Sequence, residues 1–200
     1  MKILQRATLS FCKSSKMALP SLIVFDLDAC LWSPEMYQLD NAPTKWDAKR
    51  GGVKAGSDTV TLYPGARDTL MRLLTDPKFQ ECKIAAASST TEPAYAKTCL
   101  EQTPIDLSGE RKETMGDLIK YRQIYPGSKG RSHFPKLLEQ TGVPYSEMIF
   151  FDDCGWSDNC GEVARACPGV TCVRTPRGLT KDEFNLALEG YAKGKKGVLR

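Results

Sequence analysis

The stretch Leu22–Asp28 has the sequence LIVFDLD, an apolar run that ends in two carboxylates one residue apart. Its four leading apolar residues, two of them β-branched, predict a strand buried on both faces. Asp26 and Asp28 would then lie at the carboxyl end of this strand, where open α/β sheets bind ligands. Residues two apart in a strand project to the same side. Such close carboxylates need a cation between them or a shared proton, so they predict a metal site, or a nucleophile beside a general acid.

Two further apolar runs also end in polar groups. Lys83–Ser89 (KIAAASS) ends in hydroxyls, and Met148–Asp153 (MIFFDD) ends in a second pair of carboxylates. Between them, the turn-forming stretch Tyr125–Gly130 carries Lys129. Carboxylates bind a hard cation, whereas a hydroxyl and an ammonium can hold a phosphoryl group. The order of acidic pair, hydroxyl, lysine and acidic pair therefore predicts a phosphotransfer site.

This order of motifs resembles the haloacid dehalogenase (HAD) superfamily, whose motifs are Asp-x-Asp, Ser or Thr, Lys and a late acidic pair. Within it, FDLDACLW at 25–32, AAAS at 85–88, IYPGSK at 124–129 and FFDD at 150–153 are similar to the eukaryotic magnesium-dependent phosphatase branch. The resemblance covers about residues 19–173. It implies a three-layer, Rossmann-like α/β domain with a parallel sheet and no full cap domain, and Mg²⁺ as cofactor.

The resemblance also implies chemical roles. Asp26 would attack phosphorus to give an aspartyl-phosphate, and Asp28 would act first as general acid and then as general base. The carboxylates of Asp26 and Asp153 and the backbone carbonyl of Asp28 would hold Mg²⁺. Asp152 would hold a bound water or orient Lys129. Which aspartate of the late pair is the direct metal ligand stays open, with Asp153 preferred.

The same resemblance implies the contacts of the phosphoryl group. Ser88, with Ser89 beside it and nearby backbone amides, would hold the equatorial oxygens at the start of the following helix. Lys129 would offset charge on Asp26 and on the transferring group. Structural alternatives exist, because strand-end aspartates can form turns, Ser88 can cap a helix and Lys129 can be a solvated loop residue.

Three features depart from the family pattern. Cys30 stands where threonine is usual, and a thiol hydrogen-bonds weakly, so the loop would be held less firmly by about 1 kcal/mol. Ser89 replaces an arginine that could clamp a substrate anion. Residues 154–158 (CGWSD) look like a small insertion at the mouth of the site, where Trp156 could cover a substrate ring or simply pack.

The formal charge of +4 comes from the two ends of the chain. Residues 1–20 and 193–200 hold eight of the 28 lysines and arginines and no acid, which leaves 20 basic against 24 acidic residues. The body is therefore acidic, and we expect no nucleic-acid partner. We expect a basic leader over 1–18, disordered or targeting, and a basic tail over 194–200. Cytoplasmic location is expected, with organellar import through the leader as the alternative.

One domain is expected over 19–193, because the chain has the length of an ordinary single domain. Residues 32–62 predict an irregular flap, with a hairpin around 59–62, too short for a core of its own. The site would then be open enough for a phosphate carried on a macromolecule. Helices are expected from Pro64, over 91–102, 132–141 and 159–166, and from Thr180 to about 193, with a further strand over 169–175.

Eight cysteines occur, but none forms a Cys-x-x-Cys pair, and His133 is the single histidine. The ligands for a zinc site of mixed cysteine and histidine are therefore too few, and we expect free thiols. We interpret His133 as a packing or capping residue. Cys154 and Cys160 flank the acidic pair, so their oxidation could impair catalysis.

The function expected is a Mg²⁺-dependent phosphomonoester hydrolase acting on phosphoprotein (phosphotyrosine) or sugar-phosphate substrates, monomeric and without a membrane partner. Cysteine-dependent tyrosine phosphatases and P-loop kinases are excluded because their motifs are missing. A two-component receiver has its groups in another order. The remaining alternative is a non-catalytic phospho-ligand-binding or scaffold protein on the same fold.

Overall fold

A computed structural model describes residues 18–199, so the expected leader lies almost wholly outside the described residues. Its centre is a six-stranded sheet in the order β10-β9-β8-β1-β6-β7, in which every pairing is parallel. The strands are β1 (Leu22–Phe25), β6 (Lys83–Ser88), β7 (Tyr121–Ile124), β8 (Met148–Asp152), β9 (Thr171–Arg174) and β10 (Gly197–Val198). The run before Asp26 is the central strand, and all four of its residues are fully buried.

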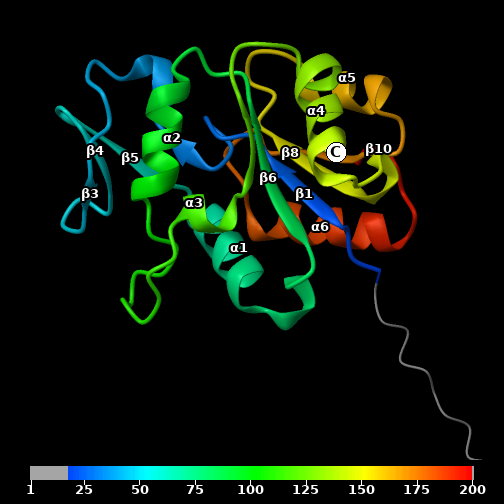
Figure 1. Cartoon of the computed structure of the whole chain (residues 1–200), viewed down its shortest axis with the longest axis horizontal. Coiled ribbons are helices and arrows are strands. Elements are labelled where there is room, and N and C mark those ends of the chain that lie inside the picture. The colour runs from blue at the N-terminus through cyan, green and yellow to red at the C-terminus, as the bar shows by residue number, and fades with distance from the viewer. Residues whose placement is uncertain (1–17, 200) are drawn as a thin grey trace, which may run out of the picture.

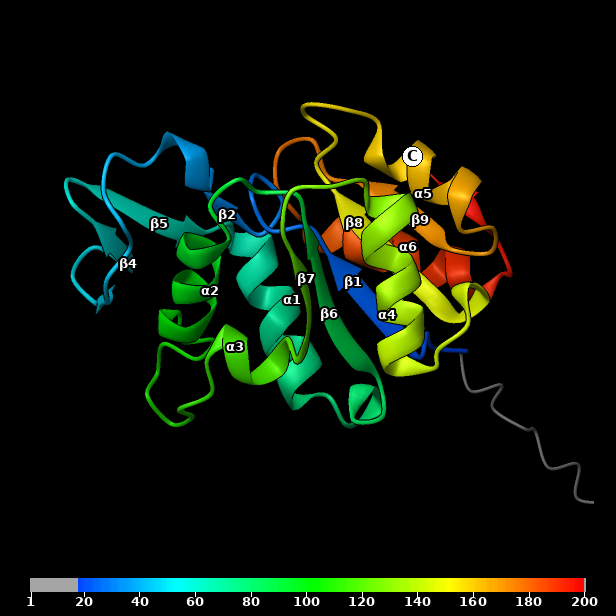
Figure 2. The same ribbon diagram turned by 45° about the horizontal axis from the view of Figure 1, so that its top comes forward.

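Helices cover both faces of this sheet. Side chains alternate along each strand, so each strand packs on the helices of both faces. Ile23 and Phe25 face a core shared with α1, α2 and α6, whereas Leu22 and Val24 face a core shared with α4 and α5. Figures 1 and 2 show the resulting three layers. The helices are α1 (Pro64–Thr75), α2 (Pro93–Gln102), α3 (Met115–Leu118), α4 (Phe134–Thr141), α5 (Asn159–Ala166) and α6 (Lys181–Ala192). The α/β three-layer prediction is confirmed.

The segment expected as an irregular flap is more regular than predicted. It forms a four-stranded antiparallel sheet in the order β2-β5-β4-β3, beside α2 at one end of the molecule (Figure 2). Gly56 turns the β4–β5 hairpin at φ +61°, where a Cβ would lie 2.4 Å from the Asn41 side chain. The elements are β2 (Trp32–Ser33), η1 (Met36–Gln38), β3 (Trp46–Asp47), β4 (Gly52–Ala55) and β5 (Asp58–Leu62). The expected hairpin is present, but within a small sheet.

Several elements differ from the sequence-based expectations. Strand β7 and helix α3 lie in a stretch for which no element was predicted, and Lys129–His133 forms a π-helical turn before α4. Gly197–Val198, expected within a basic tail, pairs with Thr171–Cys172 as an edge strand. The Gly197 N–H donates to the Val170 carbonyl at 2.8 Å and the Leu199 N–H to the Cys172 carbonyl at 2.9 Å, a pairing that no local pattern indicates. The short 3-10 turns are η2 (Pro77–Phe79) and η4 (Tyr145–Glu147).

Other expectations agree closely with the structure. Thr180 and Glu183 form the expected capping box of α6, each side chain accepting from the other residue's backbone N–H. The seven cysteines among the described residues are free thiols. None of the helices described has the length and apolar character needed to cross a membrane.

Candidate active site

The polar groups at the carboxyl ends of β6, β1 and β8 meet at one edge of the sheet. These strands are neighbours, so Ser88, Asp26 and Asp152 come together although they are far apart in the chain. The Asp26 N–H donates to the Phe151 carbonyl at 2.9 Å, which continues the β1–β8 pairing to the aspartates. The site therefore lies at the carboxyl edge, as in other open α/β sheets.

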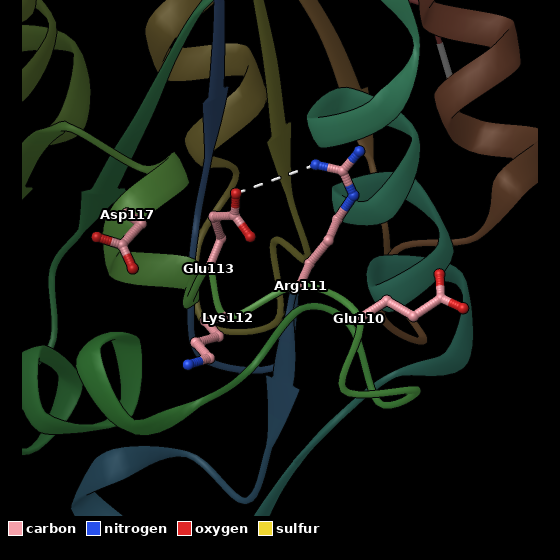
Figure 3. A pocket seen from close by; sticks show the side chains of 5 residues that line it. All are labelled: Glu110, Arg111, Lys112, Glu113 and Asp117. Carbon is pink, nitrogen blue, oxygen red and sulfur yellow. Dashed lines mark ion pairs between the residues drawn. The ribbon is translucent and has the colours of Figure 1, made fainter.

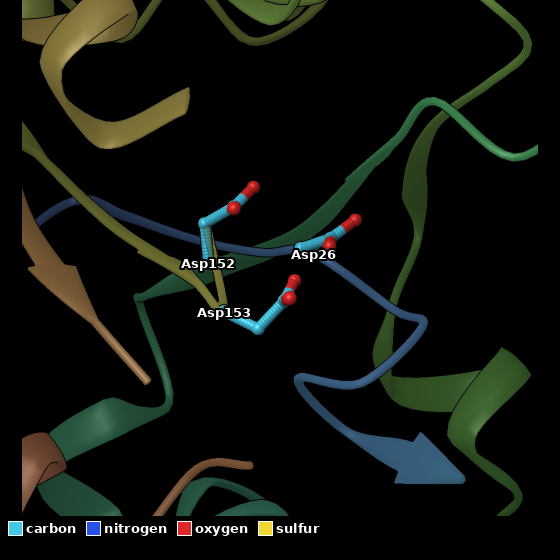
Figure 4. Close-up of side chains that lie close together, drawn as sticks. All are labelled: Asp26, Asp152 and Asp153. Atoms are coloured by element: carbon cyan, nitrogen blue, oxygen red, sulfur yellow. The ribbon is translucent and has the colours of Figure 1, made fainter. Parts of the chain in front are cut away.

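Three aspartates converge there. One carboxylate oxygen from each of Asp26, Asp152 and Asp153 lies within 4.8 Å of the others, and Figure 4 shows the three side chains at the ends of neighbouring strands. Burial raises the pKa of Asp26 well above its ordinary value, and Asp152 adds to this while Lys129 opposes it. Burial and Asp152 likewise raise the pKa of Asp153. Three crowded oxygen donors whose charges repel fit a hard divalent cation.

Lys129 is enclosed by two of these carboxylates. Its Nζ lies 2.8 Å from Asp26 Oδ1 and 2.5 Å from Asp152 Oδ2, and its side chain is 2% exposed. Burial disfavours the ammonium, but the two carboxylates outweigh burial and raise the pKa of Lys129. Lys129 is therefore an ammonium at neutral pH, and it is not a solvated loop residue.

The two aspartates of the late pair have different surroundings. Asp152 is fully buried and accepts from the Cys154 N–H at 2.8 Å and from Asn159 Nδ2 at 3.1 and 3.2 Å. Asp153 is half-buried and faces the cavity. These contacts hold Asp152 against Lys129 and leave Asp153 accessible, so they support Asp153 as the direct metal ligand; the assignment stays a prediction.

Asp28 lies apart from the cluster of three carboxylates. Its Oδ1 accepts from Trp32 Nε1 at 2.7 Å, in a site where the residue is 9% exposed. Burial raises the pKa of Asp28, and hydrogen bonds from Trp32, the Met36 backbone and Thr90 oppose this. A raised pKa favours the protonated carboxyl group that a general acid requires. The sequence patterns did not indicate this hydrogen bond from Trp32.

The hydroxyls of Ser88, which ends β6, and of Ser89, which follows it, have different hydrogen bonds. Ser88 is 1% exposed and its Oγ accepts from the Thr90 N–H at 3.4 Å. Ser89 Oγ donates to the Gly127 carbonyl at 2.8 Å, which ties this loop to the one that carries Lys129. Both serines line the cavity, but Ser89 uses its hydroxyl hydrogen on the protein.

A cavity of about 540 Å³ opens at this edge of the sheet. Six of the seven predicted site residues line it, and Asp152 alone does not: the six are Asp26, Asp28, Ser88, Ser89, Lys129 and Asp153. The cavity is also lined by Glu35, Tyr37, Asn159 and Glu162, for which the sequence patterns indicated no role in the site. Their signal was weak, because none of them belongs to an apolar run or to a motif.

A second depression, of about 630 Å³, lies beside the loop before α3 (Figure 3). It is lined by five charged residues, Glu110, Arg111, Lys112, Glu113 and Asp117. The side chains point in different directions, and the one ion pair drawn, Arg111–Glu113, measures 4.0 Å. This depression lacks the converging groups of the first cavity, so we assign no chemistry to it.

The model of the acid phosphatase family matches residues 18–194. This chain belongs to the acid phosphatase family. It is 37% identical to human magnesium-dependent phosphatase 1, over 91% of this chain and 93% of the relative. It is also 32% identical to a HAD-like hydrolase superfamily protein of Schizosaccharomyces pombe, over 67% of this chain and 76% of that one. The resemblance to the HAD superfamily is confirmed.

The fold of this acid phosphatase family member also matches a solved structure. The N-terminal part of a Bacteroides fragilis protein, which contains a phosphatase domain and was crystallised with Mg, aligns with a TM-score of 0.56 at 17% identity. The alignment covers 90% of this chain and 41% of that structure, so this chain spans less than half of its length. At this identity, the match supports the HAD-like fold alone.

Cys30 is the departure from the family that the structure explains best. Its Sγ accepts a hydrogen bond from Thr175 Oγ1 at 3.3 Å, and its carbonyl accepts from the Leu179 N–H at 2.8 Å. Burial, with the nearby Asp26, raises the pKa of Cys30, so the thiol stays neutral. The loop after β1 is therefore held to the segment after β9, but by a weak sulfur acceptor.

Proposed function

We propose that this acid phosphatase family protein is a Mg²⁺-dependent phosphomonoester hydrolase that works through an aspartyl-phosphate on Asp26. The observation that carries the proposal is Lys129, buried between Asp26 and Asp152 at the wall of an open cavity. An aspartate beside a fixed ammonium can accept a phosphoryl group whose charge the ammonium offsets.

The oxygen donors of Asp26 and Asp153, with the Asp28 backbone carbonyl, would hold Mg²⁺. The relative named magnesium-dependent phosphatase supports this choice, as does a donor set made only of hard oxygens. When bound, the ion would offset the negative charge of the carboxylates and of the phosphoryl oxygens.

The chain's own groups would move the protons. One Asp26 carboxylate oxygen forms the bond to phosphorus as the bond from phosphorus to the leaving oxygen breaks, and Asp28 donates its proton to that oxygen. Asp28, now a carboxylate, then takes a proton from the water that hydrolyses the aspartyl-phosphate. Ser88 and backbone amides at the start of the next loop would hold the equatorial oxygens.

We propose a phosphoprotein (phosphotyrosine) or a sugar phosphate as the substrate class. The small sheet β2–β5 stands beside the cavity and does not enclose it, which supports access for a phosphate on a larger molecule. Ser89 stands where the eukaryotic magnesium-dependent phosphatase branch has an arginine. Its presence supports a substrate preference that differs from that of the branch.

The test is hydrolysis of p-nitrophenyl phosphate by the purified protein, first with Mg²⁺ and then with excess EDTA. We expect turnover that EDTA removes, that Asp26→Asn abolishes and that Asp182→Asn on α6 leaves unchanged. Turnover by folded Asp26→Asn would remove the nucleophile assignment. If the folded wild-type protein hydrolyses no p-nitrophenyl phosphate under either condition, the result would favour the phospho-ligand-binding alternative.

A further inference from the structure

Two exposed aromatic side chains meet at the mouth of the cavity. Among residues 18–199, three large hydrophobic side chains are exposed, and two of them, Tyr37 and Trp156, line this cavity. Their ring centroids are 5.7 Å apart at an interplanar angle of 75°, an edge-to-face pair. Contiguous exposed apolar surface beside a cavity is a feature of ligand-binding grooves.

Trp156 is fixed in place although it is 78% exposed. Its Nε1 donates to Glu35 Oε2 at 3.0 Å, across 121 positions of sequence. This bond and the contact with Tyr37 join the loop after β8 to the 3-10 turn η1. The indole therefore presents a ring of defined orientation at the mouth, at little cost in side-chain entropy on binding.

Most charged side chains that line the cavity are carboxylates. Of the described residues that line it, Lys129 is the single cation, and it is enclosed by Asp26 and Asp152. Asp26, Asp28 and Asp153 belong to the proposed reaction, in which Asp28 begins protonated and bound Mg²⁺, with Lys129, would offset the charge of the other two carboxylates. Glu35 and Glu162 remain, and the hydroxyl of Ser128 donates to Glu162. Among residues 18–199, the outer lining of the cavity thus carries carboxylates and no lysine or arginine.

We propose that Glu35, Tyr37 and Trp156 form a leaving-group subsite for phosphomonoesters whose alcohol or phenol carries a positively charged group. Aromatic faces and carboxylates both attract an ammonium, the first through the ring quadrupole and the second through charge. An anionic leaving group would meet two carboxylates with no cation to balance them. This inference rests on the proposed function, because it concerns the leaving group of that reaction.

Three aryl phosphates with the same phenolic leaving oxygen test the inference. The phosphate esters of tyramine, N-acetyltyramine and 3-(4-hydroxyphenyl)propanoic acid carry a positive, neutral and negative arm at neutral pH. With Mg²⁺ present, we expect kcat/KM to fall in that order, by about tenfold from first to last, the size of an exposed cation–π contact plus an exposed ion pair. Because salt screens the attraction between the ammonium and the carboxylate, the differences in kcat/KM among the three esters should become smaller at high ionic strength.

Variants assign the preference to the rim. Glu35→Gln and Trp156→Leu should each lower the ratio of kcat/KM for the cationic ester to that for the neutral ester, and should change the neutral ester's value less. Glu113→Gln and Leu107→Ala are matched controls, because the Glu113 side chain is 42% exposed, Leu107 is 57% exposed and neither residue lines the cavity. Equal rates for the three esters, or an unchanged ratio in both rim variants, would overturn the inference while p-nitrophenyl phosphate turnover still supports the proposed function.

A binding measurement separates the inference from the reaction. Asp26→Asn protein is titrated with the three esters while tryptophan fluorescence is excited at a wavelength that they do not absorb. We expect the tightest binding for the tyramine ester and a signal change that Trp156→Leu removes. If the three esters bind with equal affinity, the proposed subsite is wrong whether or not the protein has activity. If the wild-type protein does not hydrolyse p-nitrophenyl phosphate but the esters bind in the expected order, the subsite holds and only the proposed phosphatase function is wrong.

Discussion

Lys129 Nζ and Asp26 Oδ1 lie 2.8 Å apart with both side chains almost excluded from water. Lys181 and Asp68 form an ion pair of the same length on the surface, with side chains 67% and 49% exposed. Equal distances carry different energies in these two places, because water screens the surface pair and leaves the buried pair strongly coupled.

Removing the buried ammonium should therefore destabilise the protein. Lys129→Met leaves Asp26 and Asp152 without a cation, and we expect a loss of about 3–5 kcal/mol in the free energy of unfolding, measured with urea in EDTA. Lys181→Met is the matched control, and its loss should stay below about 1 kcal/mol. Similar losses in the two variants would show that the buried pair contributes no more than the exposed one.

His133 should make stability depend on pH. It is fully buried, its ring nitrogens lie 3.2 Å from the Ser128 carbonyl and 3.0 Å from the Tyr125 carbonyl, and burial lowers its pKa while these contacts oppose that effect. A folded-state pKa below the ordinary 6.5 means that the unfolded chain binds the proton more readily. This contribution to stability is thus present above pH 6.5 and is lost as the pH falls through the folded-state pKa.

Two measurements check the prediction for His133. It is the single histidine of the chain, so one NMR imidazole resonance reports its titration, which we expect below 6.5. His133→Gln should remove part of the decrease in unfolding free energy between pH 7 and pH 5. A resonance that titrates above 6.5 would reverse the sign of the predicted effect.

Replacing Cys30 by threonine should strengthen the loop after β1. The Thr175 hydroxyl would then meet an oxygen in place of the sulfur that it contacts at 3.3 Å, and we expect a gain of about 1 kcal/mol with activity equal or higher. Cys30→Ala should act in the opposite direction, because it leaves the buried Thr175 hydroxyl without an acceptor. Urea unfolding and turnover of p-nitrophenyl phosphate measure both effects, and a large loss of activity in Cys30→Thr would reveal a role for the thiol.

Trp32 should lower the pKa of Asp28, the proposed general acid and base. Its indole N–H stabilises the charged form of Asp28 from 2.7 Å, so Trp32→Phe should raise the pKa of Asp28 further. The Asp28 carboxylate that forms when the proton is donated would lose a hydrogen bond to a charged group, which contributes about 1.5–3 kcal/mol. We therefore expect a fall of about tenfold or more in kcat at neutral pH, with the pH optimum of kcat moved to higher pH. The half-buried Trp46, which packs on Arg67, supplies the control Trp46→Phe. A lower kcat without a displaced optimum would mean that Trp32 acts only through packing.

The sequence by itself determined the central strand, the layers and most of the residues at the catalytic edge. Leu22–Phe25 is apolar throughout because helices cover both faces of β1, and the run ends where the chain reaches the sheet edge. The hydroxyls after β6 and the aspartates at the end of β8 follow the same local rule. Parallel strands place their carboxyl ends along one edge, so local patterns were enough to bring these groups together.

Only the tertiary structure decided which partner each group takes. The alignment of Lys129 with Asp26 and Asp152, the bond from Trp32 to Asp28 and the pairing of β10 with β9 depend on side-chain directions and strand order. The bond from Trp156 to Glu35 joins two loops that no periodicity relates. Hydrophobic burial leaves a local pattern along the chain, whereas a hydrogen bond between distant loops leaves none. The catalytic edge could therefore be predicted, and so could the place of Trp156 at the mouth of the cavity, but its bond to Glu35 could not.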